Sequence, residues 1–203
     1  MASSIPLLSL AAVEAFLRAT EVIDWRHPEV LERARRLAGG GPIAGARRCF
    51  EWVRDEIEHT VDHGRDAVTC TASQVLTVGS GLCYAKSHLL VGLLRAQGLP
   101  AGLCYQRLTC DDEGRGYCLH GLAAVFLPDH GWYRIDARGS KPGLRADFTP
   151  PVEALPFSPT LPGTLDLPGV WADPLPVVVE ALRAHTSAAT LLAHLPDLTP
   201  FGP

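Results

Sequence analysis

Residues 79–100 read GSGLCYAKSHLLVGLLRAQGLP. A glycine-containing turn runs straight into Cys83, and the residues after it follow a helical pattern. Gly98 and Pro100 end that pattern, as glycine and proline commonly do at the end of a helix. The stretch therefore predicts a helix that begins at a cysteine. Its apolar face has i, i+3, i+4 spacing and consists of Leu89, Leu90, Leu93, Leu94 and Ala96.

The position of Cys83 has two interpretations. Unpaired backbone N–H groups and the helix dipole favour an anion at a helix N-terminus, and such a position turns a thiol into a thiolate nucleophile. The alternative is a small buried cysteine that happens to begin a helix. This stretch alone supports both interpretations equally, and residues further along the chain decide between them.

Composition sets the broad class of the protein. The chain has 203 residues, of which 47% are hydrophobic and 20% are charged, with a net charge of -4. A chain of this length and composition suits one globular domain with a full core, or one domain plus a short appendage. The chain has neither a basic run nor an apolar run of about 18 residues, so neither a nucleic-acid partner nor a membrane is expected.

The N-terminus and the cysteines indicate the compartment. Residues 1–8 have no basic segment of the kind that opens a secretory signal, so a cytoplasmic location is expected. The six cysteines are then expected to be reduced, and the absence of C-x-x-C spacing disfavours a zinc site. The acidic residues 111–113 are interpreted as a solvated turn, so no metal and no cofactor are predicted.

The residues before Cys83 favour helices. Pro28 suits a first helical turn, and the glycines from Gly39 form a strong stop. A polar loop is expected at 61–68. Residues 1–20 are expected to form a strand or a short helix, the latter at 13–18. Further helices are expected at residues 28–38 and 43–59, and at a short segment capped by Thr69 or Thr71 that runs through Val78.

After Pro100 the pattern changes to that of strands. Residues 101–108, 117–127 and 132–137 are expected to form an antiparallel meander, which together with the helices predicts an α+β fold. Residues 139–176 are rich in proline but carry apolar anchors. They are interpreted as an extended segment lying over the domain with an edge strand. Two helices, at 176–184 and from a cap at Thr186 or Ser187 to His194, complete the chain.

Two strand residues can join Cys83 in a site. His120 lies within one predicted strand and Asp136 near the end of the next, within reach of cross-strand pairing. Because side chains alternate along a strand, Cys118 and His120 share a face, as do Trp132 and Asp136. If the sheet packs on the cysteine helix, the thiol, the imidazole and the carboxylate can converge.

These residue types suit thiol chemistry. A thiolate at Cys83 attacks an acyl carbon, His120 takes the thiol proton and later protonates the leaving group, and Asp136 orients the imidazole. The backbone N–H of Cys83 can help to hold the oxyanion. Each residue also has a structural interpretation: a hydrogen-bonded strand histidine, or an aspartate that forms a turn or pairs with Arg138. Their joint occurrence in this order favours the site.

Neighbouring residues are weighed for the same site. Gln74 is considered as an oxyanion donor, but its place on a short helix favours a solvated side chain. The remaining expectations are packing or a surface position for His88, exposure for Lys86, cleft lining for Tyr84, and cleft or core for Trp132. Cys118 is weighed as a second thiol near the site, with a core position favoured.

Three motifs resemble the core of the transglutaminase-like superfamily, in particular its bacterial stand-alone members. They are Gly81-Leu82-Cys83, the HGLAAV run at 120–125 and the WYRID run at 132–136. The similarity covers about residues 43–140, and residues 71–76 fit the short helix that precedes the family's cysteine. It implies a single domain over residues 1–203, with a core at about 43–140 on which the proline-rich extension and C-terminal helices at 141–203 pack. The resemblance implies a papain-like α+β fold in which N-terminal helices and the cysteine helix pack on an antiparallel sheet. It also implies Cys83, His120 and Asp136 as catalytic residues.

The resemblance implies a cysteine-dependent amide hydrolase or acyltransferase that works through a thioester. Its partners would be a peptide or amide substrate and, in a transferase, an amine acceptor. Gly121-Leu122 replaces a segment that is often aromatic in the family, which favours hydrolysis over crosslinking, and the calcium sites of animal transglutaminases have no counterpart. The alternatives are a protein-crosslinking transglutaminase, an arylamine N-acetyltransferase and a catalytically silent peptide-binding module. The substrate and the oligomeric state stay open.

Overall fold

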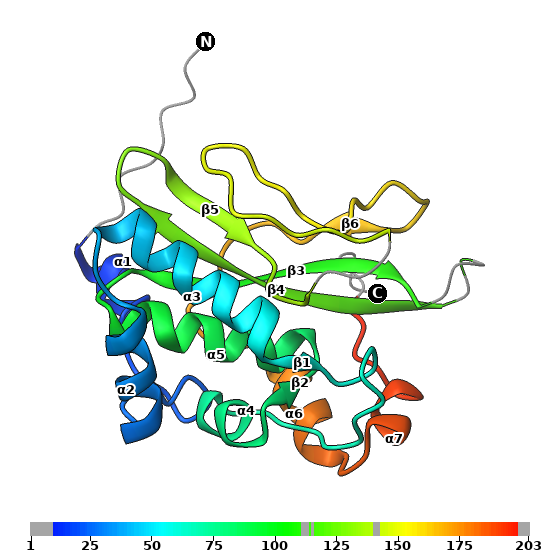
Figure 1. The fold of residues 1–203 in the computed structure, drawn as a ribbon. Coiled ribbons are helices and arrows are strands. Elements are labelled where there is room, and N and C mark those ends of the chain that lie inside the picture. The colour runs from blue at the N-terminus through cyan, green and yellow to red at the C-terminus, as the bar shows by residue number, and fades with distance from the viewer. Residues whose placement is uncertain (1–9, 111–113, 115, 140–142, 199–203) are drawn as a thin grey trace.

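The computed structural model describes residues 10–110, 114, 116–139 and 143–198. It is built around helix α5, which lies between a four-stranded sheet and three of the helices that precede it (Figure 1). The helices before α5 are α1 (Leu10–Ala15), α2 (Pro28–Leu37), α3 (Pro42–Glu56) and α4 (Ala72–Val78), and α5 itself is Cys83–Ala96. The acidic turn at 111–113 and the N-terminal segment 1–8 lie outside the described residues.

Helix α5 is buried on all sides and not only along its leucine face. Every residue from Tyr84 to Arg95 is buried, because α2, α3 and α4 pack on one side and the sheet packs on the other. Gly92 allows the close approach of α4, since a Cβ there would lie 3.3 Å from the Cβ of Ala72. The short helix α4 begins as predicted at a Thr71 cap, in a capping box with Gln74.

The sheet has the strand order β5-β4-β3-β6 and is antiparallel. Its strands are β3 (Ala101–Thr109), β4 (Tyr117–Leu127), β5 (Gly131–Ile135) and β6 (Leu165–Asp166). The register sets His120 opposite Gln106 and Ala123 opposite Ile135. Asp136 directly follows Ile135, the last residue of β5, so it lies at the end of the strand that pairs with β4.

The expected helix at 43–59 is wrong at its C-terminal end. Helix α3 ends at Glu56, and Glu58–His59 forms strand β1, which pairs in parallel with β2 (Ser80–Gly81). The hydrogen bonds from Glu58 N to Gly79 O and from Thr60 N to Gly81 O, of 3.0 and 3.2 Å, extend this pairing. A two-residue strand has no periodic signal, but this one holds the turn before Cys83 in place.

The proline-rich segment covers the sheet face opposite α5 (Figure 1). It supplies edge strand β6 and a bridge at Trp171, whose backbone exchanges hydrogen bonds of 2.8 and 2.9 Å with Leu103. Helices α6 (Pro176–Ala184) and α7 (Ala188–Leu192) follow, the latter capped by Ser187. In the described part of the chain, no helix has both the length and the apolar character needed to span a membrane.

Candidate active site

Cys83 is the first residue of the buried helix α5. It is partly exposed, whereas the residues after it in α5 are buried as far as Arg95. The N-cap residue, Leu82, makes no side-chain cap, so the first turn keeps N–H groups that can face an anion. Ser87 Oγ donates to the Cys83 carbonyl at 2.8 Å and to the Gly121 carbonyl at 3.3 Å, which ties this turn to strand β4.

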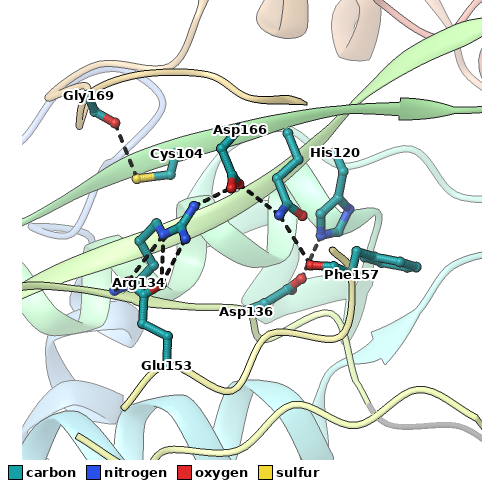
Figure 2. Close-up of polar contacts among 9 residues, drawn as sticks. Cys104, His120, Arg134, Asp136, Glu153, Phe157, Asp166 and Gly169 are labelled. Atoms are coloured by element: carbon teal, nitrogen blue, oxygen red, sulfur yellow. Dashed lines mark hydrogen bonds and ion pairs between the residues drawn. The ribbon is translucent and has the colours of Figure 1, made fainter. Parts of the chain in front are cut away.

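His120 and Asp136 form a buried pair beside Cys83. The distance from His120 Nε2 to Asp136 Oδ2 is 2.6 Å, and the two residues are 6% and 2% exposed (Figure 2). The second oxygen, Oδ1, accepts a hydrogen bond of 2.8 Å from the backbone N–H of Arg138. The Cys83 side chain lies beside His120, close enough to raise the pKa of the imidazole, and both residues line the same cleft. Since Nε2 is held by Asp136, the ring nitrogen left for the thiol is Nδ1.

The surroundings of His120 favour its protonated form. Burial by itself lowers the pKa of the imidazole, but the negative charge of Asp136 and the contact with Cys83 outweigh burial and raise this pKa to about 10. The imidazolium is thus stable between a carboxylate and a thiol. Groups with strongly shifted pKa values inside a cleft are typical of functional sites.

Gly121 brings the cysteine helix close to this pair. A Cβ at Gly121 would lie 2.8 Å from Tyr84 Cδ1 and 3.2 Å from Tyr84 Cα, so glycine is required for the observed approach of α5 to β4. The Tyr84 hydroxyl donates to the Leu119 carbonyl on the same strand. Tyr84 therefore packs on β4 at the residues before and after His120, and it lines the cleft as predicted.

The proline-rich segment packs over His120 on the face of the sheet opposite α5. The Phe157 ring lies edge-on to the imidazole, with ring centroids 4.8 Å apart. Gln106, directly opposite His120, donates to the Phe157 carbonyl at 3.3 Å and to Asp166 Oδ1 at 2.9 Å (Figure 2). These contacts exclude water from one side of His120, and the sequence offered no motif for Phe157.

The expectation that Lys86 is exposed is wrong. Lys86 is 1% exposed, and its Nζ donates to the carbonyls of Arg54 and Ile57 at the end of α3. Burial lowers the pKa of Lys86 to about 8, against a smaller opposing effect of Asp136. The unpaired carbonyls at the C-terminus of α3 explain why a cation is buried here.

A second polar group at the cleft was not predicted from sequence. Arg138 Nη1 lies 2.7 Å from Asp62 Oδ2, and His59 Nδ1 lies 3.4 Å from the same oxygen. Burial and the nearby Arg138 charge lower the pKa of His59 to about 3, so this ring is neutral at neutral pH. The sequence did not single out His59, because the helical pattern at 43–59 includes it. In the structure it belongs to β1, where it pairs with Gly81.

A cleft of about 500 Å³ connects these groups and is lined by Cys83 and His120 among others. Cys118 also lines it, half-buried, which corrects the expectation of a core position. Burial raises the pKa of the Cys118 thiol to about 12, and contact with Cys110 adds to the shift. A hollow of about 610 Å³ between α2 and α4 is larger, but its lining contains neither a cysteine nor a histidine.

Three other candidates lie outside the cleft. Gln74 caps α4, where its Oε1 accepts hydrogen bonds from the N–H groups of Cys70 and Thr71. His88 is buried, with Nδ1 2.7 Å from the Cys70 carbonyl oxygen. Trp132 packs between aromatic rings on the other end of the sheet. Within the described ranges, no group of three or more metal-ligating side chains is arranged to hold an ion.

The helices, the antiparallel sheet and the cysteine at the helix start define a papain-like α+β protein. The sequence profile of the transglutaminase-like superfamily matches residues 32–137, just over half of the chain. The chain belongs to this superfamily.

Solved structures are similar to this chain at low sequence identity. A candidate cysteine protease from Cytophaga hutchinsonii is 16% identical, with a TM-score of 0.52 over 64% of this chain and 43% of that one. The periplasmic domain of TgpA from Pseudomonas aeruginosa is 19% identical, with a TM-score of 0.49 over 64% of this chain and 48% of that domain. This chain thus spans less than half of either structure. No curated protein matches the chain.

Proposed function

We propose that the protein is a cysteine-dependent amide hydrolase or acyltransferase in which Cys83, His120 and Asp136 act together through a thioester. The observation that carries this proposal is the hydrogen-bonded pair of His120 and Asp136 beside Cys83, at the wall of a cleft that Cys83 and His120 both line. A buried structural histidine needs no thiol at a helix N-terminus beside it. A thiol at a helix N-terminus beside a buried histidine is what nucleophilic catalysis by a thiol requires.

In the first half of the reaction, His120 Nδ1 accepts the thiol proton and the Cys83 sulfur attacks the carbonyl carbon of the bound amide. The oxygen of the tetrahedral intermediate is stabilised by backbone N–H groups at the start of α5. The C–N bond then breaks as His120 gives its proton to the leaving amine. The products of this half are a free amine and an acyl group on the Cys83 sulfur.

In the second half, water or a second amine attacks the thioester carbon, and His120 takes the proton of this nucleophile. The C–S bond breaks, the acid or the new amide leaves, and the thiol is restored when the proton returns to the sulfur. Asp136 keeps the proton of neutral His120 on Nε2, so that Nδ1 is free to act as the base. The Arg138 N–H holds the other oxygen of Asp136 and fixes the plane of this carboxylate.

The presence of glycine at position 121 does not indicate whether the enzyme favours hydrolysis or crosslinking. The small size of Gly121 is explained by the contact with Tyr84, so the missing aromatic residue reflects how closely α5 and β4 pack. Water and an amine therefore stay as the two acceptors in the proposal. The location in the cytoplasm and the single domain over residues 1–203 also stay predictions.

A selective alkylation experiment tests the proposal. Wild type and the His120→Ala variant are treated with iodoacetamide at mildly acidic pH, and the labelled cysteines are quantified by mass spectrometry. Cys110, an exposed cysteine at the same cleft, is the internal reference for a solvent-accessible thiol. We expect Cys83 to react at least about tenfold faster than Cys110 in wild type and to lose this advantage in His120→Ala. Equal rates in wild type would instead favour a catalytically silent binding module.

A further inference from the structure

Large apolar side chains are exposed at the same cleft that holds Cys83. Six large hydrophobic residues are exposed in the described part of the chain. Three of them line this cleft: Val61 at 43%, Leu161 at 50% and Leu192 at 42% exposed. Single exposed apolar residues are ordinary, but their concentration at one concave site indicates a binding surface.

The apolar lining comes from segments far apart in the sequence. Leu108 and Leu119 are on the sheet, Phe157 and Pro159 belong to the proline-rich segment, and Leu195 follows α7. The chain holds these segments together, since Leu119 N donates to the Pro196 carbonyl at 2.7 Å. Phe157 continues this lining up to the His120 ring. An apolar group in the cleft would therefore lie next to the reacting atoms.

The charged groups of the cleft compensate one another. Among the described lining residues, Asp62 and Arg138 form an ion pair of 2.7 Å, and the charge of protonated His120 is paired with Asp136. His59, next to them, is neutral because burial lowers its pKa to about 3. A charged substrate group would have to displace this ion pair, whereas an apolar group only displaces water from Leu161 and Leu192.

We propose that the cleft binds a large apolar group, aliphatic or aromatic, attached to the carbonyl that Cys83 attacks. This inference rests on the proposed function of Cys83 and names its substrate class: amides of hydrophobic acyl groups, such as peptides with a bulky apolar residue at the cleavage point. Its volume of about 500 Å³ lies within the range of small-molecule sites. Acyl groups with a charge at the same place are excluded.

Matched alkylating reagents test this substrate class. Iodoacetamide, N-benzyl iodoacetamide and its 4-carboxybenzyl analogue deliver the same reactive carbon with no side group, an apolar one and a charged one. The rate for Cys83 with each reagent is divided by its rate with glutathione. We expect this ratio to be at least about tenfold higher for the benzyl reagent than for iodoacetamide, because an apolar pocket discriminates by that order. The carboxybenzyl analogue should show no such gain.

Three variants locate the binding surface. Leu161→Glu and Leu192→Glu place a charge in the cleft at exposed positions, and each should reduce the benzyl preference by about fivefold or more. Val152→Glu is the matched control, because Val152 is 68% exposed and is not part of the cleft lining. A benzyl preference that is absent, or equal in all three variants, would overturn the inference. The proposed function would then still stand if Cys83 remained selectively reactive, and it falls only if Cys83 reacts like Cys110.

Discussion

Replacing Gly121 by alanine should uncouple the cysteine helix from the histidine strand. The new Cβ would lie 2.8 Å from Tyr84 Cδ1, at least 0.6 Å short of the 3.4 Å at which ordinary contacts begin. It would also lie 3.2 Å from Tyr84 Cα, and the backbone of α5 cannot move aside as a flexible side chain does. The first turn of α5, with Cys83, must therefore shift away from β4 by a substantial fraction of an ångström.

The expected cost is larger for reactivity than for stability. Overpacking of this kind destabilises a fold by about 1–3 kcal/mol, whereas a displacement of about 1 Å between reacting groups costs on the order of a hundredfold in rate. Gly121 has no positive φ, so the effect of alanine would come from the Cβ contact and not from backbone strain. We therefore expect Gly121→Ala to remain folded and to lose between tenfold and about a hundredfold of the selective labelling rate of Cys83.

The assay combines iodoacetamide labelling of Cys83 with urea unfolding of the same samples. Gly92→Ala is the matched control, because it adds a Cβ to the buried interior of the same helix, 3.3 Å from Ala72 Cβ and more than two helical turns beyond Cys83. It should leave the labelling rate within about twofold of wild type. If Gly121→Ala labelled as fast as Gly92→Ala while its stability dropped, the packing of Tyr84 on Gly121 would not position the thiol, and the reasoning would fail.

Three further predictions follow from charges in and near the site. Asp136→Asn should lower amide turnover on the order of a thousandfold and move the alkaline limb of the pH–rate profile to lower pH, because loss of the carboxylate lowers the pKa of His120; an unmoved limb would contradict this assignment. Lys86→Met should remove a pH dependence of stability measured by urea unfolding. In wild type the folded state, with the Lys86 pKa lowered to about 8, binds fewer protons than the unfolded state, so its free energy of unfolding should rise from about pH 8 to pH 10.5. Cys118→Ala should keep turnover within about threefold, because a thiol whose pKa is raised to about 12 is not a nucleophile at neutral pH; a loss comparable to that of Cys83→Ala would refute its passive role.

The sequence contained enough information to predict where the groups of the site lie. Cys83 is preceded by a glycine turn and followed by a helical period, and two strands joined by a short turn carry His120 within the first and Asp136 directly after the second. These are local signals, and the strand register converts them into proximity. The Thr71 cap follows from equally local chemistry, whereas the edge strand was expected only somewhere within residues 139–176.

What the sequence did not reveal depends on packing between distant segments. Lys86 is buried because the C-terminal end of α3 packs against α5. No pattern within α5 indicates the α3 carbonyls that accept hydrogen bonds from its ammonium group. His59 reaches the cleft through a two-residue strand, too short for a periodic signal. The apolar lining around Phe157 needs the proline-rich segment and the C-terminal helix to meet over the sheet, which is a tertiary event.

The most direct test is to trap the acyl group on Cys83. The protein is incubated with the p-nitrophenyl ester of an apolar acyl group, quenched in acid, digested and examined by mass spectrometry, with and without hydroxylamine. We predict the acyl mass on the peptide that contains Cys83, its release by hydroxylamine, and its absence in Cys83→Ala with a large loss in His120→Ala. An acyl group found on another cysteine, or on Cys83 to the same extent in His120→Ala, would contradict the account.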